Sequence, residues 1–566
     1  MDYIIAPAPS RSAAAAPSIS GNSNPLSSAP EDFPCDGVPP SYLRNLIDSH
    51  GGESEFEGST TSDFKRTVIV PKTHATRMSL CAQMRQEGDA RIQPATWFVS
   101  HPWQMKFLDL VRALESFFAD KPDAIIWLDF ISTSQHQFAP SDRPPEWWQH
   151  TFRLAIGQMG QMVMVMTPWE NPVALTRAWC LYELYACRSS GSRFSVAFPP
   201  CERARFIAEI VESGDAFFDM LGKVNTAKSE CSRETDRQRI FSAVQGLAGG
   251  FSALDRGVLS TMTEWLQLQL EERMQQATRD GHERDACSAQ HALAVLFEKK
   301  TEYDRARVLF EQCFAARRAL LGADHPDTLA SLHELAGSFS NKLDHDRALL
   351  LAQDCLARRT QVLGEMHPDT LSSVLGLACI YDVKGQFDRA RQLHEECLSK
   401  RRAVLGPDHP KVLVSMANLA RVCLQTKDLS FALELFDDCC TQSRLVNGDD
   451  HPNTLSYLSS LASCYRALGH SELALGMFEK CYAGECRVLG EEHESAIVSL
   501  FNMANLLAES KRLDRALDLF RKCHTLSHRA LGCGHPTTKK CNECVQRCQI
   551  QLAFSRFSGN DAKMFE

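Results

Sequence analysis

The 566-residue sequence contains no run of about 18 apolar residues, the length that a helix needs to cross a membrane. It also lacks an excess of positive charge, because 61 Lys and Arg residues stand against 70 Asp and Glu residues, for a net charge of −9. General nucleic-acid binders and proteins of anionic membrane surfaces need a cationic excess. We therefore expect neither nucleic acid nor a membrane among the partners.

Several catalytic and targeting motifs are missing as well. The sequence has no Gly-rich phosphate loop ending in Lys, no HExxH zinc motif and no serine nucleophile elbow. Its 22 cysteines fall below the roughly 8 to 10% that is typical of a disulfide scaffold. The first residues show no basic stretch followed by an apolar one, the pattern of a secretory signal. We expect an intracellular, cytoplasmic protein with reduced thiols, no metal and no required cofactor.

The composition changes along the chain and predicts a multidomain protein. The beginning is rich in Ala, Ser, Pro and Gly, which bury too little apolar surface to offset the entropy of the chain, so a disordered leader is predicted there. One short helix, Tyr42–Ser49, is predicted within it. The predicted parts are a leader (1–62), an α/β domain (63–200), a helical extension (201–280), a repeat array (281–550) and a tail (551–566).

Short apolar runs alternate with amphipathic stretches between Ala95 and Phe198, a pattern typical of a mostly parallel sheet wound with helices. Met105–Phe118 and Leu175–Cys187 are predicted to be helices. The segment Thr67–Val70 is a candidate fifth strand. The four predicted strands are Ala95–Ser100, Ala124–Asp129, Met162–Thr167 and Arg193–Phe198.

The second half of the sequence repeats itself every 42 residues. A Leu-Gly pair followed by His-Pro recurs, and copies of the histidine stand at positions 325, 367, 409, 451, 493 and 535. An alanine series has the same step, at positions 306, 348, 390, 432, 474 and 516. Self-similarity at such a period predicts a solenoid, in which each unit buries its apolar face only against its neighbours.

One unit, residues 365–406, can be interpreted as a helical hairpin. Pro368 suits the first turn of a helix, Gly385 separates it from a second helix, and Gly406 ends that helix. The spacing of Leu377-Ala378, Tyr381 and Ala390 resembles that of tetratricopeptide repeats, and the LGxxHPxT linkers resemble the kinesin light chain type. The resemblance implies an all-α solenoid of six hairpins and a capping helix, which binds a peptide or protein in a concave groove.

In arrays of the kinesin light chain type, an Asn beside the Leu-Ala pair contacts the backbone of the bound peptide. The matching positions in this sequence are Asn418 and Asn502, and an amide can donate to and accept from an extended peptide at once. An ordinary exposed or capping Asn is the alternative. The other copies of this position are Glu334, Gly376, Ser460 and Cys544.

The cysteines of the array also recur every 42 residues, at positions 313, 355, 397, 439, 481 and 523. Consecutive copies lie one hairpin apart, too far for a disulfide or a shared metal, so we predict that they pack in the core. The repeated histidines are interpreted as structural linkers for the same reason. Near the end, Cys541, Cys544 and Cys548 follow Cys533 and His535, a set that suits either zinc or the buried face of a capping helix. We favour the capping helix.

The predicted α/β domain contains the segment Trp179-Cys180-Leu181-Tyr182-Glu183-Leu184. Together with Phe98-Val99-Ser100 and Trp127-Leu128-Asp129, it resembles the TIR family, which has a flavodoxin-like sheet and a WCxxEL helix motif. Enzymatic members use the Glu of this motif to cleave NAD, and many other members only assemble with like domains. The resemblance implies Glu183 as the catalytic residue, or alternatively as a helix residue paired with Arg177.

The cleavage chemistry is compatible with a single carboxylate. Nicotinamide leaves as a neutral base, and a carboxylate can stabilise the oxocarbenium-like ribosyl centre. Because such sheets bind ligands outside the carboxyl ends of their strands, we expect a NAD⁺ pocket there. Its candidate lining residues are Ser100, His101, Trp103, Asp129 and Trp179.

Two functions follow from the sequence. In the first, the array binds a protein partner and the TIR-like domain self-associates or signals. In the alternative, the protein is in addition a NAD⁺ glycohydrolase that uses Glu183 and is regulated by the array.

Overall fold

The computed structural model describes residues 33–561, apart from residues 137–152 and short gaps at 213–214, 223, 232–233, 247–249, 301, 342–343, 408, 532 and 534–535. The described residues form two compact units that divide between residues 268 and 269, inside one long helix. None of the described helices is both long enough and apolar enough to cross a bilayer.

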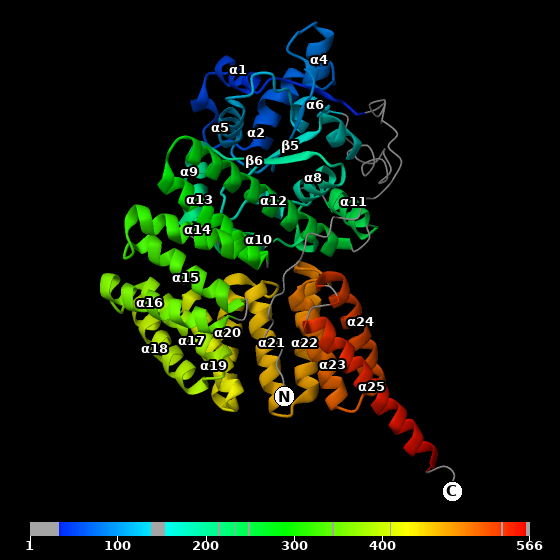
Figure 1. Cartoon of the computed structure of the whole chain (residues 1–566). Helices are drawn as coiled ribbons and strands as arrows, with labels where there is room; N and C mark the ends of the chain where they lie inside the picture. Colours follow the sequence, from blue (N-terminus) through cyan, green and yellow to red (C-terminus); the bar gives the residue numbers. More distant parts are fainter. Residues whose placement is uncertain are drawn as a thin grey trace. The chain divides into compact units, whose positions relative to one another are not determined.

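The first unit contains a four-stranded parallel sheet with the strand order β4-β3-β5-β6. Its strands are β3 (Trp97–Ser100), β4 (Ile126–Trp127), β5 (Gln161–Val165) and β6 (Arg193–Ala197). Successive side chains of a strand point to opposite faces, so both faces of these buried runs need a cover. Figure 1 shows helices α5 (Phe107–Phe118) and α8 (Ala178–Ser189) on either side of strands β5 and β6.

The other elements of the first unit are short, except for the last helices. Strands β1 (Asp36–Gly37) and β2 (Gln93–Pro94) form a small antiparallel pair. The elements before the sheet are α1 (Ser41–Ser49), η1 (Glu53–Phe56), α2 (Thr61–Phe64), η2 (Lys65–Ile69), α3 (Val70–Lys72) and α4 (Leu80–Gln86). The later ones are α6 (Asp129–Ser132), η4 (Val173–Thr176), α9 (Pro200–Glu212), α10 (Asp215–Gly222), η5 (Thr226–Lys228), α11 (Glu234–Gln245) and α12 (Gly250–Arg279).

The structure differs from the predicted leader from residue 33 onwards. The short helix over Tyr42–Ser49 is present as α1, but it packs into the core of the α/β unit, where Tyr42, Leu43 and Ile47 are buried. Arg44 adds a hydrogen bond to Glu115 of α5 at 2.7 Å. The segment has too few apolar side chains to form a core of its own, so its composition predicted disorder. Its apolar side chains instead pack onto the core that the rest of the α/β unit forms.

Two expected strand features also differ. Thr67–Val70 is helical, because the Thr60 side chain and Asp63 form a capping box that starts α2, and the helical turns continue through η2. The predicted strand Ala124–Asp129 is shorter, since β4 ends at Trp127 and Asp129 begins α6. The carboxylate of Asp129 therefore sits on a helical turn just beyond the strand.

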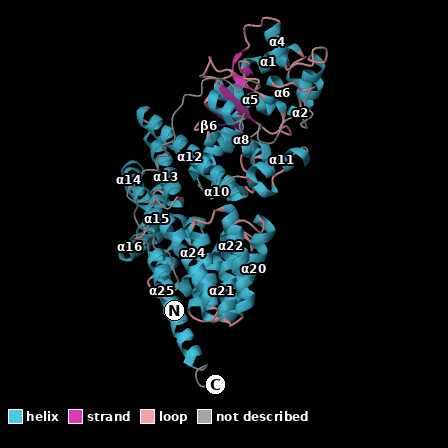
Figure 2. Ribbon diagram, turned by 90° about the vertical axis from the view of Figure 1, so that its right-hand side faces the viewer, coloured by secondary structure: helices cyan, strands magenta, loops and turns pink. Residues whose placement is uncertain are grey.

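The second unit is a solenoid of antiparallel helices (Figures 1 and 2). Within the described residues, six helical hairpins are followed by one final helix, as the sequence predicts. The first helices of the hairpins, here called A helices, are α13 (Glu283–Lys299), α15 (Pro326–Asn341), α17 (Pro368–Val383), α19 (Pro410–Gln425), α21 (Pro452–Ala467) and α23 (Glu494–Glu509). The second, or B, helices are α14 (Tyr303–Leu321), α16 (His345–Leu363), α18 (Phe387–Leu405), α20 (Leu429–Asn447), α22 (Ser471–Val488) and α24 (Leu513–Leu531), and the final helix is α25 (Pro536–Asp561).

The repeated small residues lie in the core of the hairpins, as predicted. All six alanines of the series, from Ala306 to Ala516, are fully buried, and so are the six cysteines from Cys313 to Cys523. Each of these thiols donates to the carbonyl of the residue 26 positions earlier, on the preceding A helix. The thiol thus packs like a small apolar group and also satisfies a backbone acceptor.

The repeated histidines cap the A helices, which confirms the structural interpretation. Nδ1 of His367 accepts from the backbone N–H of Asp369 at 3.1 Å, and the same bond recurs in four other copies. Those copies are His325, His409, His451 and His493. The sixth copy, at position 535, lies outside the described residues.

The cysteines near the end form the buried face of α25, in line with the favoured interpretation. Cys541, Cys544 and Cys548 pack with Cys523 in the apolar core of the last repeat. Cys533 is exposed. In the part of the chain that the structure describes, no group of His, Cys, Asp and Glu side chains is arranged to hold a metal ion.

One core position of the array holds an unexpected histidine. Four B helices place a buried Phe there, at positions 310, 436, 478 and 520, whereas the third hairpin places His394, which is fully buried. Both ring nitrogens of His394 lack a hydrogen-bond partner among the described residues. Burial lowers the pKa of His394 to about 4, and the same cause lowers the pKa of His333 to about 4 and that of His291 to about 3. These three rings are therefore neutral in the folded array.

Buried neutral histidines predict a loss of stability in acid. Because the pKa is lower in the folded than in the unfolded state, the unfolded chain takes up protons first as the pH falls below about 6.5. Each histidine then costs about 2 kcal/mol at pH 5. The carboxyl of Glu485 acts in the opposite direction, since burial raises its pKa to about 7.

We expect the substitution His394→Phe to reduce the difference in unfolding free energy between pH 7.5 and pH 5 by about 2 kcal/mol. The measurement is urea unfolding of the 281–566 fragment followed by helical circular dichroism. We expect this fragment to fold alone, because each repeat packs only against its neighbours. The exposed His470 provides the control, and His470→Gln should leave the pH dependence unchanged. An equal pH dependence in wild type and His394→Phe would contradict the argument.

Candidate functional site

The first candidate site begins at the carboxyl end of β3. Ser100 ends this strand with 1% of its surface exposed, and His101 follows with 7%. The strand is buried along its whole length, so it carries these two polar side chains into the interior. Ser100 Oγ and His101 Nε2 are both buried and have no hydrogen-bond partner among the described residues.

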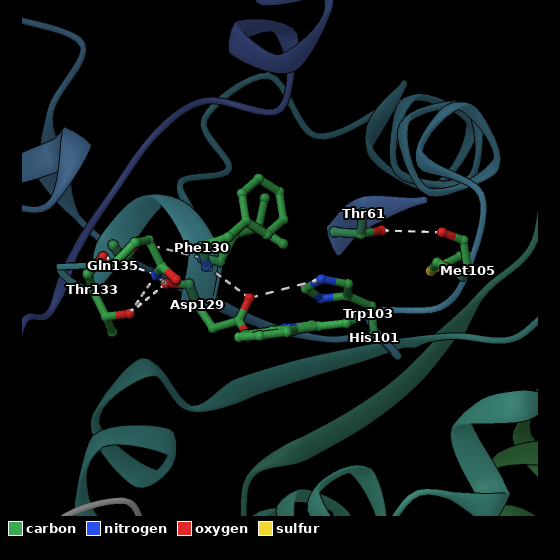
Figure 3. Close-up of polar contacts among 10 residues, drawn as sticks. Thr61, His101, Trp103, Met105, Asp129, Phe130, Thr133 and Gln135 are labelled. Carbon is green, nitrogen blue, oxygen red and sulfur yellow. Dashed lines mark hydrogen bonds and ion pairs between the residues drawn. The ribbon is translucent and has the colours of Figure 1, made fainter. Parts of the chain in front are cut away.

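Asp129 lies beside His101, at the start of α6 (Figure 3). Its Oδ2 accepts a hydrogen bond from the indole Nε1 of Trp103, and its Oδ1 accepts from the backbone N–H of Phe130 at 2.7 Å. His101 Nε2 lies 3.7 Å from Oδ1. The ammonium of Lys65 lies 3.8 Å from the centre of the Trp103 ring, so cation–π attraction also helps to hold the indole in place.

Helix α8 brings Glu183 to the same place. The residue as a whole is half-buried, but its Oε2 atom is buried and has no hydrogen-bond partner in the described part of the chain. Burial raises the pKa of Glu183 to about 8; the neighbouring Ser100 hydroxyl lowers it, and the negative charge of Asp129 raises it further. The carboxyl is therefore largely protonated at neutral pH.

Helix α8 also carries Cys180 and Trp179, the other two residues of interest in the WCxxEL motif. Cys180, one turn before Glu183, is buried, and burial raises the pKa of its thiol well above the usual value. Its position three residues before Glu183 in the WCxxEL motif was the signal that could have placed it here. Trp179 is half-buried in the first turn of α8, and Arg177 forms an ion pair with Glu230 at 3.3 Å.

We call Ser100, His101, Asp129 and Glu183 the strand-edge cluster. The structure thus brings together four residues that the sequence placed in the candidate pocket, with Trp103 bonded to one of them. Three of the four carry a buried polar atom without a partner among the described residues. An unpaired buried polar atom costs about 1 to 3 kcal/mol, so a cluster of them is favourable where a ligand supplies the partners.

The second candidate site is the face of the array formed by the A helices. The A helices from α13 to α21 contact their neighbours in the row directly, and Arg421 of α19 reaches Asp382 of α17 at 3.0 Å. Asn418 and Asn502 lie on this row of helices and are half-buried. Neither amide makes a side-chain hydrogen bond within the described residues.

The other copies of the Asn position are occupied differently. At Gly376 an added Cβ would stand 2.9 Å from Cε1 of His333, so the preceding A helix fills the space there. The Ser460 hydroxyl donates to the carbonyl of Ser456 on its own helix at 3.0 Å. Cys544 is buried in the last core. The amides of Asn418 and Asn502 are thus available for hydrogen bonds, while these three copies are not.

Sequence reasoning missed a series of buried arginines. Arg359 is 4% exposed, and its Nη1 donates to the carbonyl of Asp369 at 2.8 Å and to the hydroxyl of Ser373 at 2.9 Å. Arg317 and Arg401 make the same pair of bonds one repeat earlier and one repeat later. In the next three repeats the position holds Ser443, Glu485 and Ser527. The 42-residue step of Arg and of the Ser that follows 14 residues later was the available signal.

Comparison with known proteins identifies the repeats. Residues 285–361, 369–444 and 432–484 match one tetratricopeptide repeat family, and residues 498–537 match a second. No curated protein matches the chain. The matches place tetratricopeptide repeats along the solenoid.

Solved structures are similar to parts of the chain. One is described as a kinesin light chain of Podosopora anserina with nearly identical TPR-like repeats; it is 28% identical, covers 36% of this chain and 95% of its own, and has a TM-score of 0.31. BtubC (BKLC) from P. vanneervenii is 16% identical, with coverages of 40% and 92% and a TM-score of 0.35. Rap protein complexed with Competence and Sporulation Factor is 10% identical, with coverages of 62% and 99% and a TM-score of 0.38.

Proposed function

Because tetratricopeptide repeats extend over most of residues 285–537, we propose that the protein is an intracellular interaction protein whose array binds a protein partner. The partner is an extended peptide segment that lies along the A helices. The observation that carries the proposal is the row of A helices, on which the amides of Asn418 and Asn502 are unpaired among the described residues. An amide that makes no bond within the described part of the chain can pair with a peptide backbone, in which every residue except Pro offers a donor and an acceptor.

We expect the double substitution Asn418→Ala, Asn502→Ala to weaken partner binding about tenfold or more, as two lost hydrogen bonds would. Partners are first captured with the wild-type full chain and identified by mass spectrometry. The affinity of the best-enriched partner segment is then measured for both proteins. Ser460→Ala is the control, because the Ser460 hydroxyl already bonds to its own helix. Unchanged affinity in the double variant would defeat the assignment of the two amides.

For the α/β unit we propose a TIR-like assembly or effector module. In support of this proposal, the parallel sheet has its second strand in sequence at the edge, followed by the first, third and fourth, and flavodoxin-like sheets begin with the same order. The WCLYEL segment lies on α8, the helix that leads into the last strand. Self-association of residues 33–268, measured by light scattering, tests the assembly role. A strictly monomeric fragment at high concentration would count against it.

A second candidate function is hydrolysis of NAD⁺ at Glu183. The observation that favours it is the strand-edge cluster, in which partnerless polar atoms of Ser100, His101 and Glu183 are buried together. In this reaction the bond between ribose and nicotinamide breaks with its electron pair leaving on the nicotinamide, and water adds to the ribosyl carbon and loses a proton. An ionised Glu183 would stabilise the positive charge that develops on the ribosyl centre. Release of nicotinamide by the clustered protein is the direct test.

A further inference from the structure

The protonation of the His101 ring can be assigned from its surroundings. Burial lowers the pKa of His101, and this effect exceeds the opposite effects of the negative charge of Asp129 and of a hydrogen bond to the backbone of Val99. Since Nε2 has no partner among the described residues, Nδ1 makes the bond to Val99, where it donates to the carbonyl. A neutral ring with its proton on Nδ1 has a lone pair on Nε2, so Nε2 is a hydrogen-bond acceptor.

The atom that faces Nε2 is also an acceptor. Asp129 accepts hydrogen bonds through both oxygens, from Trp103 and from the Phe130 backbone, which is how a carboxylate behaves. Its Oδ1 and the Nε2 of His101 are 3.7 Å apart, and Figure 3 shows the two groups directed toward each other. Two acceptors cannot hydrogen-bond to each other, so Nε2 gains no partner from Oδ1.

We propose that His101 Nε2 and Asp129 Oδ1 together accept hydrogen bonds from the two vicinal hydroxyls of a ribosyl group. A vicinal diol presents two O–H donors side by side, which suits two acceptors 3.7 Å apart. The His101 side chain is 2% exposed and that of Asp129 is 34% exposed, so the diol approaches from the Asp129 side. This inference rests on the proposed NAD⁺ hydrolysis, and it identifies the ribose diol as the part of the substrate that the site recognises.

The placement agrees with the chemistry assigned to Glu183. Asp129 raises the pKa of Glu183 and lies 3.7 Å from His101, so the acceptor pair and the carboxyl are neighbours. In a ribose held by these hydroxyls, the anomeric carbon is bonded to a carbon that carries one of them, so the reacting carbon is close to the acceptor pair. The same ring then provides both the recognised diol and the reacting carbon.

The test compares two ligands by equilibrium titration calorimetry on the full chain. One is NAD⁺, and the other is its analogue that lacks both hydroxyls of the nicotinamide ribose. The Glu183→Gln protein is used to prevent turnover. We expect NAD⁺ to bind about tenfold or more tightly than the analogue, because the analogue leaves two buried acceptors unpaired. In Glu183→Gln, His101→Phe, this preference should fall to about threefold or less, since one acceptor is gone.

Each result decides the matter. Equal binding of the two ligands, no binding of NAD⁺, or a preference that persists in the His101→Phe protein would overturn the proposal. Asp129→Asn, which turns one acceptor into a donor at a partly exposed position, gives the same test if His101→Phe fails to fold. Nicotinamide release by the wild type is measured separately. Release without a diol preference refutes only this inference, whereas a diol preference without release refutes only the hydrolysis.

Discussion

Replacing Glu183 with Gln is expected to lower the release of nicotinamide from NAD⁺ by about 100-fold or more, with no loss of folding. Glutamine has the shape of glutamate and can take part in similar hydrogen bonds, but it has no negative charge to stabilise the ribosyl cation. The assay uses the protein concentrated on a surface, because the assembly role proposed for the α/β unit is favoured by a high local concentration. Nicotinamide is quantified by chromatography, and thermal unfolding confirms equal stability.

The pH dependence of the same assay gives a second readout. Because burial raises the pKa of Glu183 to about 8, only a minor fraction is ionised at pH 7. The rate should therefore rise with pH up to about 8 and then level off, by about tenfold per pH unit on the acidic side.

Glu57 provides a matched control for the charge change. It is exposed and lies outside the strand-edge cluster, so Glu57→Gln should leave the rate unchanged. Equal rates for wild type and Glu183→Gln would remove Glu183 from the mechanism. The absence of turnover in both, under clustering, would leave the α/β unit with an assembly role alone.

The second large effect is expected in the array, where Ala390→Glu should destabilise the third hairpin by about 3 to 5 kcal/mol. Ala390 is fully buried between the helices of the hairpin. A glutamate there brings a larger side chain and a charge for which the apolar surroundings offer no partner. Urea unfolding of the 281–566 fragment, followed by circular dichroism, measures the loss.

Ala403 lies on the same helix and is exposed, so Ala403→Glu should change the stability by about 0.5 kcal/mol or less. The pair of variants separates the effect of burial from that of helix propensity. If Ala390→Glu unfolds at the same urea concentration as wild type, Ala390 is not the close-packed position that the structure describes.

The architecture of the array was predictable because the same residue types recur at equivalent positions of successive repeats. Six copies of the alanine, six of the cysteine and the recurring His-Pro pair fix the helix boundaries and the buried face, and the structure places them accordingly. His394 could not be recognised from one repeat, since a buried histidine is unusual. Alignment with Phe436 and Phe478 shows that it replaces a core aromatic.

The α/β unit was less predictable, because its elements occur once. Apolar runs located the four strands, but Thr67–Val70 has strand-like side chains and is helical, since its conformation is decided by the capping box upstream. The burial of Tyr42 and Leu43 depends on a surface formed by residues far along the chain. The strand-edge cluster followed from the general position of sites in such sheets, whereas the acceptor pair of His101 and Asp129 depends on side-chain geometry.

The buried arginines determine which repeats can be neighbours. Arg317, Arg359 and Arg401 each need the hydroxyl of a serine 14 residues later, on the A helix of the next hairpin. Any one 42-residue hairpin among the first three can therefore be deleted, and the second or third can be duplicated, without leaving a guanidinium unpaired. Deletion of the fourth hairpin would place Arg401 next to the fifth, where Tyr457 occupies the position of the serine. The guanidinium would then be buried against an aromatic ring, without the serine hydroxyl. Changes in the length of the array are thus tolerated near its start and restricted at its fourth hairpin.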